Sequence, residues 1–453
     1  MERGALLKTK TSMVRTFLHY TLSVMLMMVV AACGDGGDYT GGDSGNETSF
    51  TITYTKDNTT AYVTKLLTHT TGNGFPIVIM ADGYTQSEID NGAYRTAVNK
   101  TITSLFAKEP MASMKAYFDV YEVAAASSVS GITTTKSNTA FSTYFTSSSG
   151  VEIEGNTDKI ENYTWMALGK NNNRFSDSQI IVLVNSNRYA GITLLSYKSE
   201  TTDSIPSGLS LSYMPVGCIS GGKSYFTEVL QHEAVGHGIG KLADEYYDTY
   251  TSPTADDINK YKSQQKAGVF LNTKYDADTE NSEIAGSGTL TMGNVKYNIM
   301  VGAHKMKPGE LGYLFANDGG YADDGLMWYQ GGSLYLTLGE QYSGPVSRYA
   351  GYYTLEKNFY RPTWESIMNS VFRSGGDEFN VLSRYIIYAR ILKVAQGSPG
   401  NIHNEDLMRR FMQFDKWYGI TSSTSAAKGI GGTFAAEETP LPPLAQPKVI
   451  RVD

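Results

Sequence analysis

The order of apolar and polar residues predicts that the folded part of the chain begins with a strand pair and a βαβ unit. Residues 49–69 alternate between apolar and polar side chains, as in a hairpin with one buried face. Residues 75–81 form a continuous apolar run that ends in Asp-Gly, which indicates a buried strand followed by a turn. Apolar residues then recur at helical spacing over 87–108, and a second apolar run follows at 117–126. Strand, helix and strand in this order predict a βαβ unit.

Further strands are predicted before the most informative helix. Residues 178–186 give the strongest strand pattern, and residues 190–197 are expected to be their neighbour in the sheet. A weaker strand pattern covers 212–220, where Pro215 favours an edge or irregular position because proline lacks the amide proton. A helix is predicted to begin at about Tyr225. Together these elements predict an α+β fold with a small mixed sheet and helices.

The C-terminal half is predicted to be a loop-rich subdomain. Residues 250–345 are rich in Gly, Asp, Asn and Tyr, which predicts long loops with short elements. A second helix is predicted at 380–394, with Asn380 as its N-cap. The Ser-, Gly- and Pro-rich end, 421–453, predicts an extended or poorly ordered tail.

Residues 1–33 predict a targeting segment rather than part of the fold. Lysines and an arginine precede an apolar stretch, 17–30, that is too short to span a membrane. It ends in Val-Ala-Ala before Cys33, which resembles the lipobox of bacterial lipoproteins and implies cleavage before Cys33 and lipidation of this residue. A plain signal peptide cleaved near Ala32 is the alternative. Residues 34–49 are rich in Gly, Asp and Ser and predict a flexible tether.

Composition narrows the possible partners and cross-links. The formal charge of −7 and the lack of a basic run exclude nucleic acid as an expected partner, because phosphate neutralisation needs clustered positive charge. Besides Cys33 the chain has only Cys218, so no intrachain disulfide is expected to stabilise the exported protein. The exported protein is therefore expected to be stabilised by its core and any bound metal. It is expected to be a monomer.

The residues that carry chemistry are gathered between 228 and 246. His232 is followed directly by Glu233, and His237 comes five residues after His232. In zinc proteases one face of a helix presents two imidazoles to the metal while such a glutamate activates the bound water. Five residues on a regular α-helix would separate the imidazoles by roughly 140°. We therefore predict a wide, π-type turn between the histidines, which absorbs the extra residue.

A third metal ligand is expected close behind this helix, because catalytic zinc takes three protein ligands and keeps one position for water. Asp244 comes seven residues after His237 and is the preferred candidate. Glu245 follows directly and is the alternative ligand. A capping or supporting role is the other interpretation of each carboxylate. For the oxyanion that forms during hydrolysis, Tyr360 and Arg361 are the candidate donors.

The stretch HEAVGHGIGKLADEY resembles the signature of the IgA-peptidase family of zinc metallopeptidases (metallopeptidase family 64), which occurs in gut bacteria. The likeness extends over roughly residues 74–395 and includes Asp82-Gly83-Tyr84 and the Ser-Ile-Met sequence at 366–368. It implies a metzincin-like fold, in which Met368 occupies a turn beneath the zinc. The extra residue between Glu233 and the second histidine departs from the family core, although a similar wide spacing occurs in the dipeptidyl-peptidase III family.

These observations predict a zinc-dependent endopeptidase that cleaves extracellular proteins, with Zn²⁺ as cofactor and Glu233 as general base. The catalytic domain would span 50–420. A catalytically inactive, surface-exposed binding lipoprotein that keeps the peptidase fold is the first alternative. A cysteine hydrolase that uses Cys218 is the second, and no local sequence pattern supports it.

The expected location is the outer membrane, with the folded part exposed at the cell surface. Lipidation at one residue supplies two or more acyl chains, which suffice for stable anchoring. The membrane is therefore expected to be contacted through the lipid anchor alone. Asp35 lies close behind Cys33, and in lipoproteins of some gut bacteria acidic residues there favour export to the surface.

Overall fold

The structure is a computed structural model, and it describes most of the first 275 residues and selected segments beyond them. The described residues are 49–169, 172–198, 205–246, 254–275, 327–330, 333–336, 349–352, 355–361, 366–369, 378–397, 444–452 and parts of 400–415. Within these ranges, no helix has the length and apolar character needed to cross a membrane.

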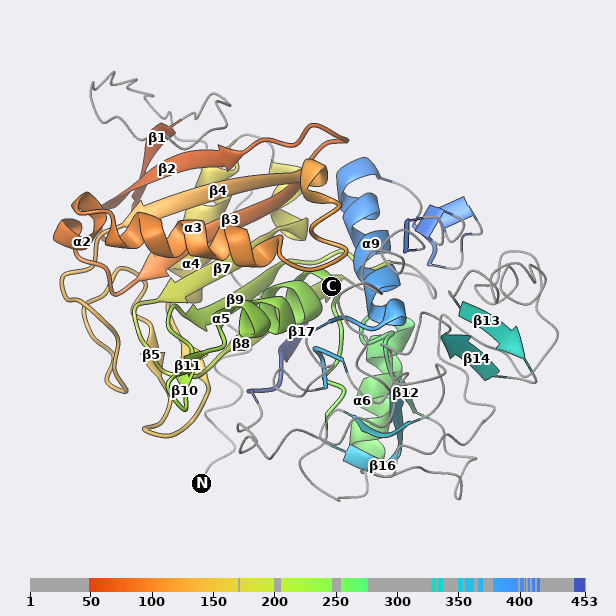
Figure 1. Ribbon diagram of the computed structural model, residues 1–453. Coiled ribbons are helices and arrows are strands. Elements are labelled where there is room, and N and C mark those ends of the chain that lie inside the picture. Colours follow the sequence, from red (N-terminus) through yellow and green to blue (C-terminus); the bar gives the residue numbers. More distant parts are fainter. Residues whose placement is uncertain are drawn as a thin grey trace.

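A mixed sheet of eight strands forms the centre of the fold (Figure 1). In spatial order the strands are β1 (Ser49–Tyr54), β2 (Thr59–Leu67), β4 (Phe118–Ala125), β3 (Phe75–Asp82), β7 (Gln179–Val184), β9 (Ser210–Pro215), β8 (Ile192–Lys198) and β17 (Lys448–Val452). The central strands β4, β3, β7 and β9 run parallel to one another. β1 and β2 form the antiparallel hairpin that their alternating sequence predicted.

Helices cover both faces of this sheet. On one face lie α3 (Ala93–Leu105), α5 (Phe226–Leu230), η3 (Gln231–Ile239) and α9 (Val381–Gln396), and on the other face lies α4 (Thr157–Ala167). Along β3, Ile77 and Ile79 pack into the core of the first face, whereas Val78 and Met80 pack into the core that α4 shares. Because both faces are buried, the central strands read as continuous apolar runs rather than alternating ones.

The remaining described elements are short or lie outside the large sheet. They are α2 (Gln86–Asp90), η1 (Lys115–Tyr117), β5 (Tyr144–Phe145), β6 (Ile153–Glu154), η2 (Asn172–Asp177), β10 (Ile219–Ser220), β11 (Lys223–Ser224), α6 (Ala255–Lys266), β12 (Lys274–Tyr275), β13 (Met327–Gln330), β14 (Ser333–Leu336), β15 (Tyr349–Tyr352) and β16 (Leu355–Arg361). The predicted loop region 250–345 lies largely outside the described residues. Its described part contains α6, a helix that the sequence analysis did not predict and that begins with a capping box at Thr254.

The predicted βαβ unit is present as β3, α3 and β4, with the two strands adjacent and parallel. Its helical segment, however, is not one helix over 87–108. The chain forms the short α2, turns at Gly92, and restarts as α3. Gly92 has a φ of 85°, a left-handed conformation that glycine adopts readily and that interrupts a right-handed helix.

Two predictions about the sheet were wrong. Residues 190–197 were expected beside the strand at 178–186, but β9 lies between β7 and β8. Pro215 favoured an edge or an irregular position for this strand, yet β9 is central, regular and completely buried. Proline is tolerated there because it is the last residue of the strand. With β9 inside and β17 added, the sheet is larger than the small one predicted.

The C-terminal tail also differs in part from the prediction. Residues 448–452 form β17, which pairs in parallel with β8 from Lys448–Leu194 to Val452–Lys198. Ahead of β17, the buried Leu444 belongs to the core on the η3 face. The end of the chain is therefore an integral edge strand and not an extended tail, whereas 416–443 lie outside the described residues. The helix predicted at 380–394 is confirmed as α9, and the side chain of Asn380 caps it through the amide of Ser383.

Asp82, at the end of β3, anchors the long loop that follows β4. Its buried carboxylate accepts hydrogen bonds from Gly83 N, Ser127 Oγ, Thr139 Oγ1, Phe141 N, Thr143 N and Thr143 Oγ1, at 2.6–3.1 Å. A carboxylate saturated in this way has no free lone pair for a ligand. The Asp-Gly-Tyr sequence singled out above thus organises the fold and does not belong to the site described next.

Candidate metal centre

The two histidines lie on one continuous helix that widens where they occur. α5 passes at Leu230 directly into η3, a π-helix of nine residues. Each turn of a π-helix takes up one residue more than an α-turn, so positions five apart come to the same face. The rings of His232 and His237 consequently lie 4.7 Å apart, centroid to centroid. The predicted wide turn is confirmed, although the wide geometry extends over nine residues rather than over a single turn.

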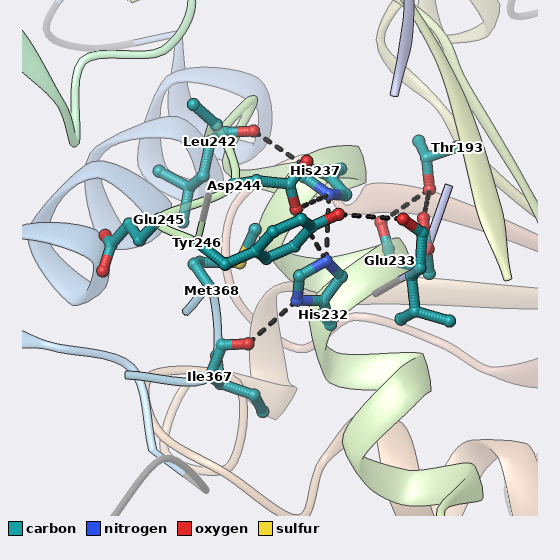
Figure 2. Close-up of polar contacts among 12 residues, drawn as sticks. Thr193, His232, Glu233, His237, Leu242, Asp244, Glu245, Tyr246, Ile367 and Met368 are labelled. Carbon is teal, nitrogen blue, oxygen red and sulfur yellow. Dashed lines mark hydrogen bonds and ion pairs between the residues drawn. The ribbon is translucent and has the colours of Figure 1, made fainter. Parts of the chain in front are cut away.

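Three side-chain atoms converge at this face of the helix (Figure 2). His232 Nε2 and His237 Nε2 are 3.1 Å apart, and Asp244 Oδ1 lies 3.1 Å from the first and 3.2 Å from the second. All three side chains are buried. Ligand atoms held about 2.0–2.1 Å from a tetrahedral zinc ion are roughly 3.3–3.4 Å apart, so this triangle has nearly the size of one face of such a site.

The other ring nitrogens fix the direction in which each imidazole presents a lone pair. His232 Nδ1 lies 2.8 Å from the carbonyl oxygen of Ile367, and His237 Nδ1 lies 2.8 Å from that of Leu242. A carbonyl oxygen only accepts, so each Nδ1 carries a proton and donates it. In the neutral rings both Nε2 atoms then present lone pairs toward one another and toward a carboxylate oxygen. Three acceptors at this separation repel one another unless a cation lies among them.

The charge of Asp244 is consistent with such a cation site. Both of its carboxylate oxygens are buried and have no hydrogen-bond donor among the described residues. Burial by itself would raise the pKa of Asp244, but when the rings of His237 and His232 are protonated, their positive charge and hydrogen bonds outweigh this effect and lower the pKa to about 2. A buried, ionised and unbonded carboxylate beside two imidazoles is the donor set that divalent zinc prefers. The residues present therefore fit the metal.

Glu233 follows the first histidine and lies beside the group (Figure 2). Its side chain is buried, and burial raises its pKa to about 8. Thr193 donates a hydrogen bond of 2.7 Å to Oε2, while Oε1 has no partner among the described residues. Gly191 packs against this side chain, since a β-carbon at residue 191 would lie 3.0 Å from Glu233 Cγ. The helix thus offers a carboxylate with one constrained and one open oxygen next to the candidate metal ligands.

The structure separates the two candidate carboxylates at positions 244 and 245. Asp244 faces the histidines, whereas the carboxylate of Glu245 points to the opposite side of the chain (Figure 2). It accepts hydrogen bonds from Asn272 Nδ2 at 2.9 Å, from Asn380 Nδ2 at 3.0 and 3.1 Å, and from Ser366 Oγ at 2.5 Å. Glu245 therefore connects the segment that carries Asp244 to α9 and to the turn at 366–369.

The turn at 366–369 supports the group from below the helix. Met368 is buried, and its sulfur fills the space beside Gly236, where a β-carbon would come within 2.3 Å of Sδ. The carbonyl of Met368 accepts a hydrogen bond of 2.7 Å from Glu245 N. The adjacent Ile367 carbonyl accepts a hydrogen bond from His232. This short turn therefore holds one candidate ligand, His232, and the segment that carries another, Asp244. The family resemblance assigned Met368 to a turn beneath the zinc, and this role stays a prediction.

Tyr246 is a residue of the site for which the sequence analysis assigned no function. Its ring stacks on His232 with 6.4 Å between centroids and 22° between ring planes. Its hydroxyl donates a hydrogen bond of 2.9 Å to the carbonyl of Leu444, just before β17. In the sequence, its position two residues after Asp244, at the end of the LADEY stretch, was what could have pointed to it. Proximity along the chain does not show whether a tyrosine lines the site or lies on the surface.

Other candidates lie apart from the group or outside the described residues. Tyr360 and Arg361 belong to β16, which pairs with β12, and the described features do not include their side chains, so their oxyanion role stays a prediction. Cys33 lies outside the described residues. Cys218 is buried, and burial raises the pKa of its thiol to about 12, which leaves it protonated and unreactive near neutral pH. This argues against the cysteine-hydrolase alternative.

A mixed α/β fold in which one helix presents two histidines, with an intervening glutamate, to a nearby aspartate is the architecture of a metallopeptidase domain. Residues 65–280 match the family model described as IgA Peptidase M64. The matched segment is somewhat less than half of the 453 residues, and through it the chain is similar to that peptidase family. The segment includes His232, Glu233, His237 and Asp244, and it ends before the turn at 366–369. No curated protein matches the chain.

Proposed function

We propose that the protein is a zinc-dependent endopeptidase that hydrolyses extracellular proteins, with Glu233 as general base. The observation that carries this proposal is the buried triangle of His232 Nε2, His237 Nε2 and Asp244 Oδ1, with sides of 3.1–3.2 Å. Beside it lies one oxygen of Glu233 that has no hydrogen-bond partner within the described part of the chain. Two nitrogens and one oxygen are the donor types of a catalytic zinc site, which keeps a fourth position for water. Similarity to a peptidase family over residues 65–280 supports a protein or peptide substrate.

The residues of the site have separate roles in binding the metal, transferring the proton and orienting the imidazoles. His232, His237 and Asp244 would hold the metal. Bound zinc lowers the pKa of a water molecule toward neutrality and polarises a carbonyl group. Glu233 would accept a proton from the attacking water and return it to the leaving amine, a step that typically contributes 10²–10⁴-fold to the rate. Ile367 and Leu242 keep both imidazoles in the tautomer that presents Nε2, because their carbonyls accept the Nδ1 protons.

Metal removal tests this proposal. The purified protein should contain close to one zinc per chain and should cleave a mixed peptide library. Dialysis against a chelator should remove both the metal and the cleavage, and stoichiometric zinc should restore cleavage. A thiol reagent is the control and should have no effect, because Cys218 is buried.

The same experiment separates the main alternative. A protein that binds one zinc but cleaves no member of the library would be the inactive binding lipoprotein. A protein that cleaves and is insensitive to chelation would contradict the metal mechanism altogether. The position of Glu233 beside the group favours the active enzyme, since a purely structural metal site has no need of a neighbouring carboxylate with one oxygen that lacks a hydrogen-bond partner among the described residues.

We also propose that the enzyme is a lipoprotein of the outer membrane and is exposed at the cell surface. The lipobox-like sequence at Cys33 and the tether at 34–49 support this, since the tether separates the anchor from the fold. Cys33→Ser is expected to release the protein from the membrane fraction without changing its activity. Cys218→Ser, the same change at the other cysteine, should stay in that fraction. Retention of Cys33→Ser after a high-salt wash would contradict a single lipid anchor, and protease treatment of intact cells tests the exposure.

A further inference from the structure

Three polar side chains lie together on the sheet face that η3 covers. Thr193 of β8, Ser212 of β9 and Gln179 of β7 are all buried, and Thr193 and Ser212 are directly paired across the two strands. We call these three residues the polar chain. Their strand neighbours Ile192 and Tyr213 belong to the core on the α4 face, so the polar chain faces η3. Polar groups buried at such a place need a partner, and the partner here is Glu233.

The distances join the polar chain to the carboxylate in a fixed order. Gln179 Nε2 lies 3.0 Å from Ser212 Oγ, Ser212 Oγ lies 2.9 Å from Thr193 Oγ1, and Thr193 Oγ1 lies 2.7 Å from Glu233 Oε2. Thr193 Oγ1 is also 2.9 Å from the backbone carbonyl of Glu233, and Ser212 Oγ is 3.4 Å from the same oxygen. The shortest contact is the one that ends on the carboxylate.

Counting protons sets the direction of these hydrogen bonds. The amide nitrogen of Gln179 only donates, and it donates to Ser212 Oγ and to the carbonyl of Ile180 at 2.8 Å. The opposite orientation of the amide would bring two oxygens together at Ile180. Ser212 then has one proton left, and its nearest remaining acceptor is Thr193 Oγ1. Thr193 in turn has one proton, and the carboxylate of Glu233, in the ionised form in which it can act as a base, is a stronger acceptor than a backbone carbonyl.

The helix is shaped to accept the polar chain. Gly238 lies over the amide of Gln179, and a β-carbon at residue 238 would come within 2.1 Å of Gln179 Oε1. Any side chain at this position would therefore displace the first member of the polar chain. Glycine at 238 allows the π-helix to pack directly on the three polar side chains.

We propose that Thr193, supported by Ser212 and Gln179, is a positioning residue that holds Glu233 Oε2 and thereby leaves Oε1 as the oxygen that takes the proton of the attacking water. The inference rests on the proposed function. As the water O–H bond breaks, an Oε1–H bond forms and the water oxygen bonds to the carbonyl carbon of the peptide; the C–N bond then breaks as the same proton passes from Oε1 to the nitrogen of the leaving amine. Oε1 is free for this step because, among the described residues, it has no hydrogen-bond partner. Small displacements of a reacting group can cost as much as about 10²-fold in rate, so fixing this carboxylate matters for kcat.

The test compares Thr193→Val with Thr193→Ser in the full chain. Valine has nearly the shape of threonine but lacks the hydroxyl, and it should lower kcat at least ~10-fold while KM stays within about 2-fold and zinc content is unchanged. Serine keeps the hydroxyl and should stay within about 3-fold of the original kcat. The matched control is Thr164→Val in α4, where the buried hydroxyl donates to the carbonyl of Ile160 at 2.9 Å; its kcat should not change.

The outcomes separate a positioning residue from a structural one. If Thr193→Val loses stability but keeps its full kcat, or loses zinc in proportion to activity, the inference is wrong. If Thr193→Val does not fold, kcat of Ser212→Ala is measured instead. This change removes the hydrogen bond between Ser212 and Thr193 but leaves the one between Thr193 and Glu233. An unchanged kcat of Ser212→Ala overturns the inference. If the original chain itself shows no chelator-sensitive cleavage, the proposed function has failed and the inference fails with it.

Discussion

Glu233→Gln is expected to lower peptide hydrolysis at least ~10²-fold while the zinc stays bound and the fold stays intact. Glutamine has the shape of glutamate, and its side-chain oxygen can still accept the hydrogen bond from Thr193. It cannot take up a proton at neutral pH, so only the general base is lost. The metal ligands are untouched, because His232, His237 and Asp244 make their contacts with one another and with backbone carbonyls.

The measurement is kcat on a peptide substrate together with zinc content and thermal unfolding of the same preparation. Glu161→Gln is the matched control. Glu161 lies in α4 on the far face of the sheet, and partial burial raises its pKa to about 7, so this change also removes a half-buried glutamate. It should leave kcat unaltered. A Glu233→Gln enzyme that cleaves at the original rate would show that another group accepts the proton.

Asp244→Ala and Glu245→Gln are expected to have opposite signatures although the two residues are adjacent. Asp244→Ala removes a proposed ligand, and zinc affinity should fall at least about 100-fold. Removing a residue that only hydrogen-bonds to a metal ligand already lowers metal affinity about 10–100-fold. Hydrolysis should be lost with the metal. Glu245→Gln should keep the metal but lower the melting temperature, because its amide group would face the amide donors of Asn272 and Asn380.

Zinc affinity is measured by competition with a chelator of known strength, and stability by thermal unfolding with saturating metal. Each variant serves as the control for the other, since both remove one buried negative charge from the same segment. A Glu245→Gln protein that has lost its metal, beside an Asp244→Ala protein that retains it, would reverse the assignment of the third ligand.

Short-range features of this protein could be predicted because they depend on nearby residues. A carboxylate next to a histidine, with a second histidine five positions later, requires a widened helix if both rings are to meet one ion, and the π-helix η3 meets this requirement. Continuous apolar runs indicated the buried strands β3 and β7, and a side chain at residue 380 indicated the start of α9.

Strand order could not be predicted in the same way. The position of β9 between β7 and β8 depends on which strands find each other across the chain, and no local pattern encodes that choice. The same holds for β17, whose residues look like a tail in isolation but complete the edge of the sheet beside β8. Its Pro-rich approach suggested disorder, whereas pairing with β8 and burial of Leu444 determine its structure.

By itself the sequence determined the chemical types available at the site: two imidazoles, a general base and two adjacent carboxylates within 14 residues. Only the tertiary structure decided which carboxylate faces the histidines, because the partners that turn Glu245 away, Asn272, Ser366 and Asn380, come from three other segments. It also decided which oxygen of Glu233 is free, since Thr193 reaches it from a neighbouring strand. Residue types and their spacing are local properties of a chain, but the hydrogen bonds that orient each side chain connect residues far apart along it.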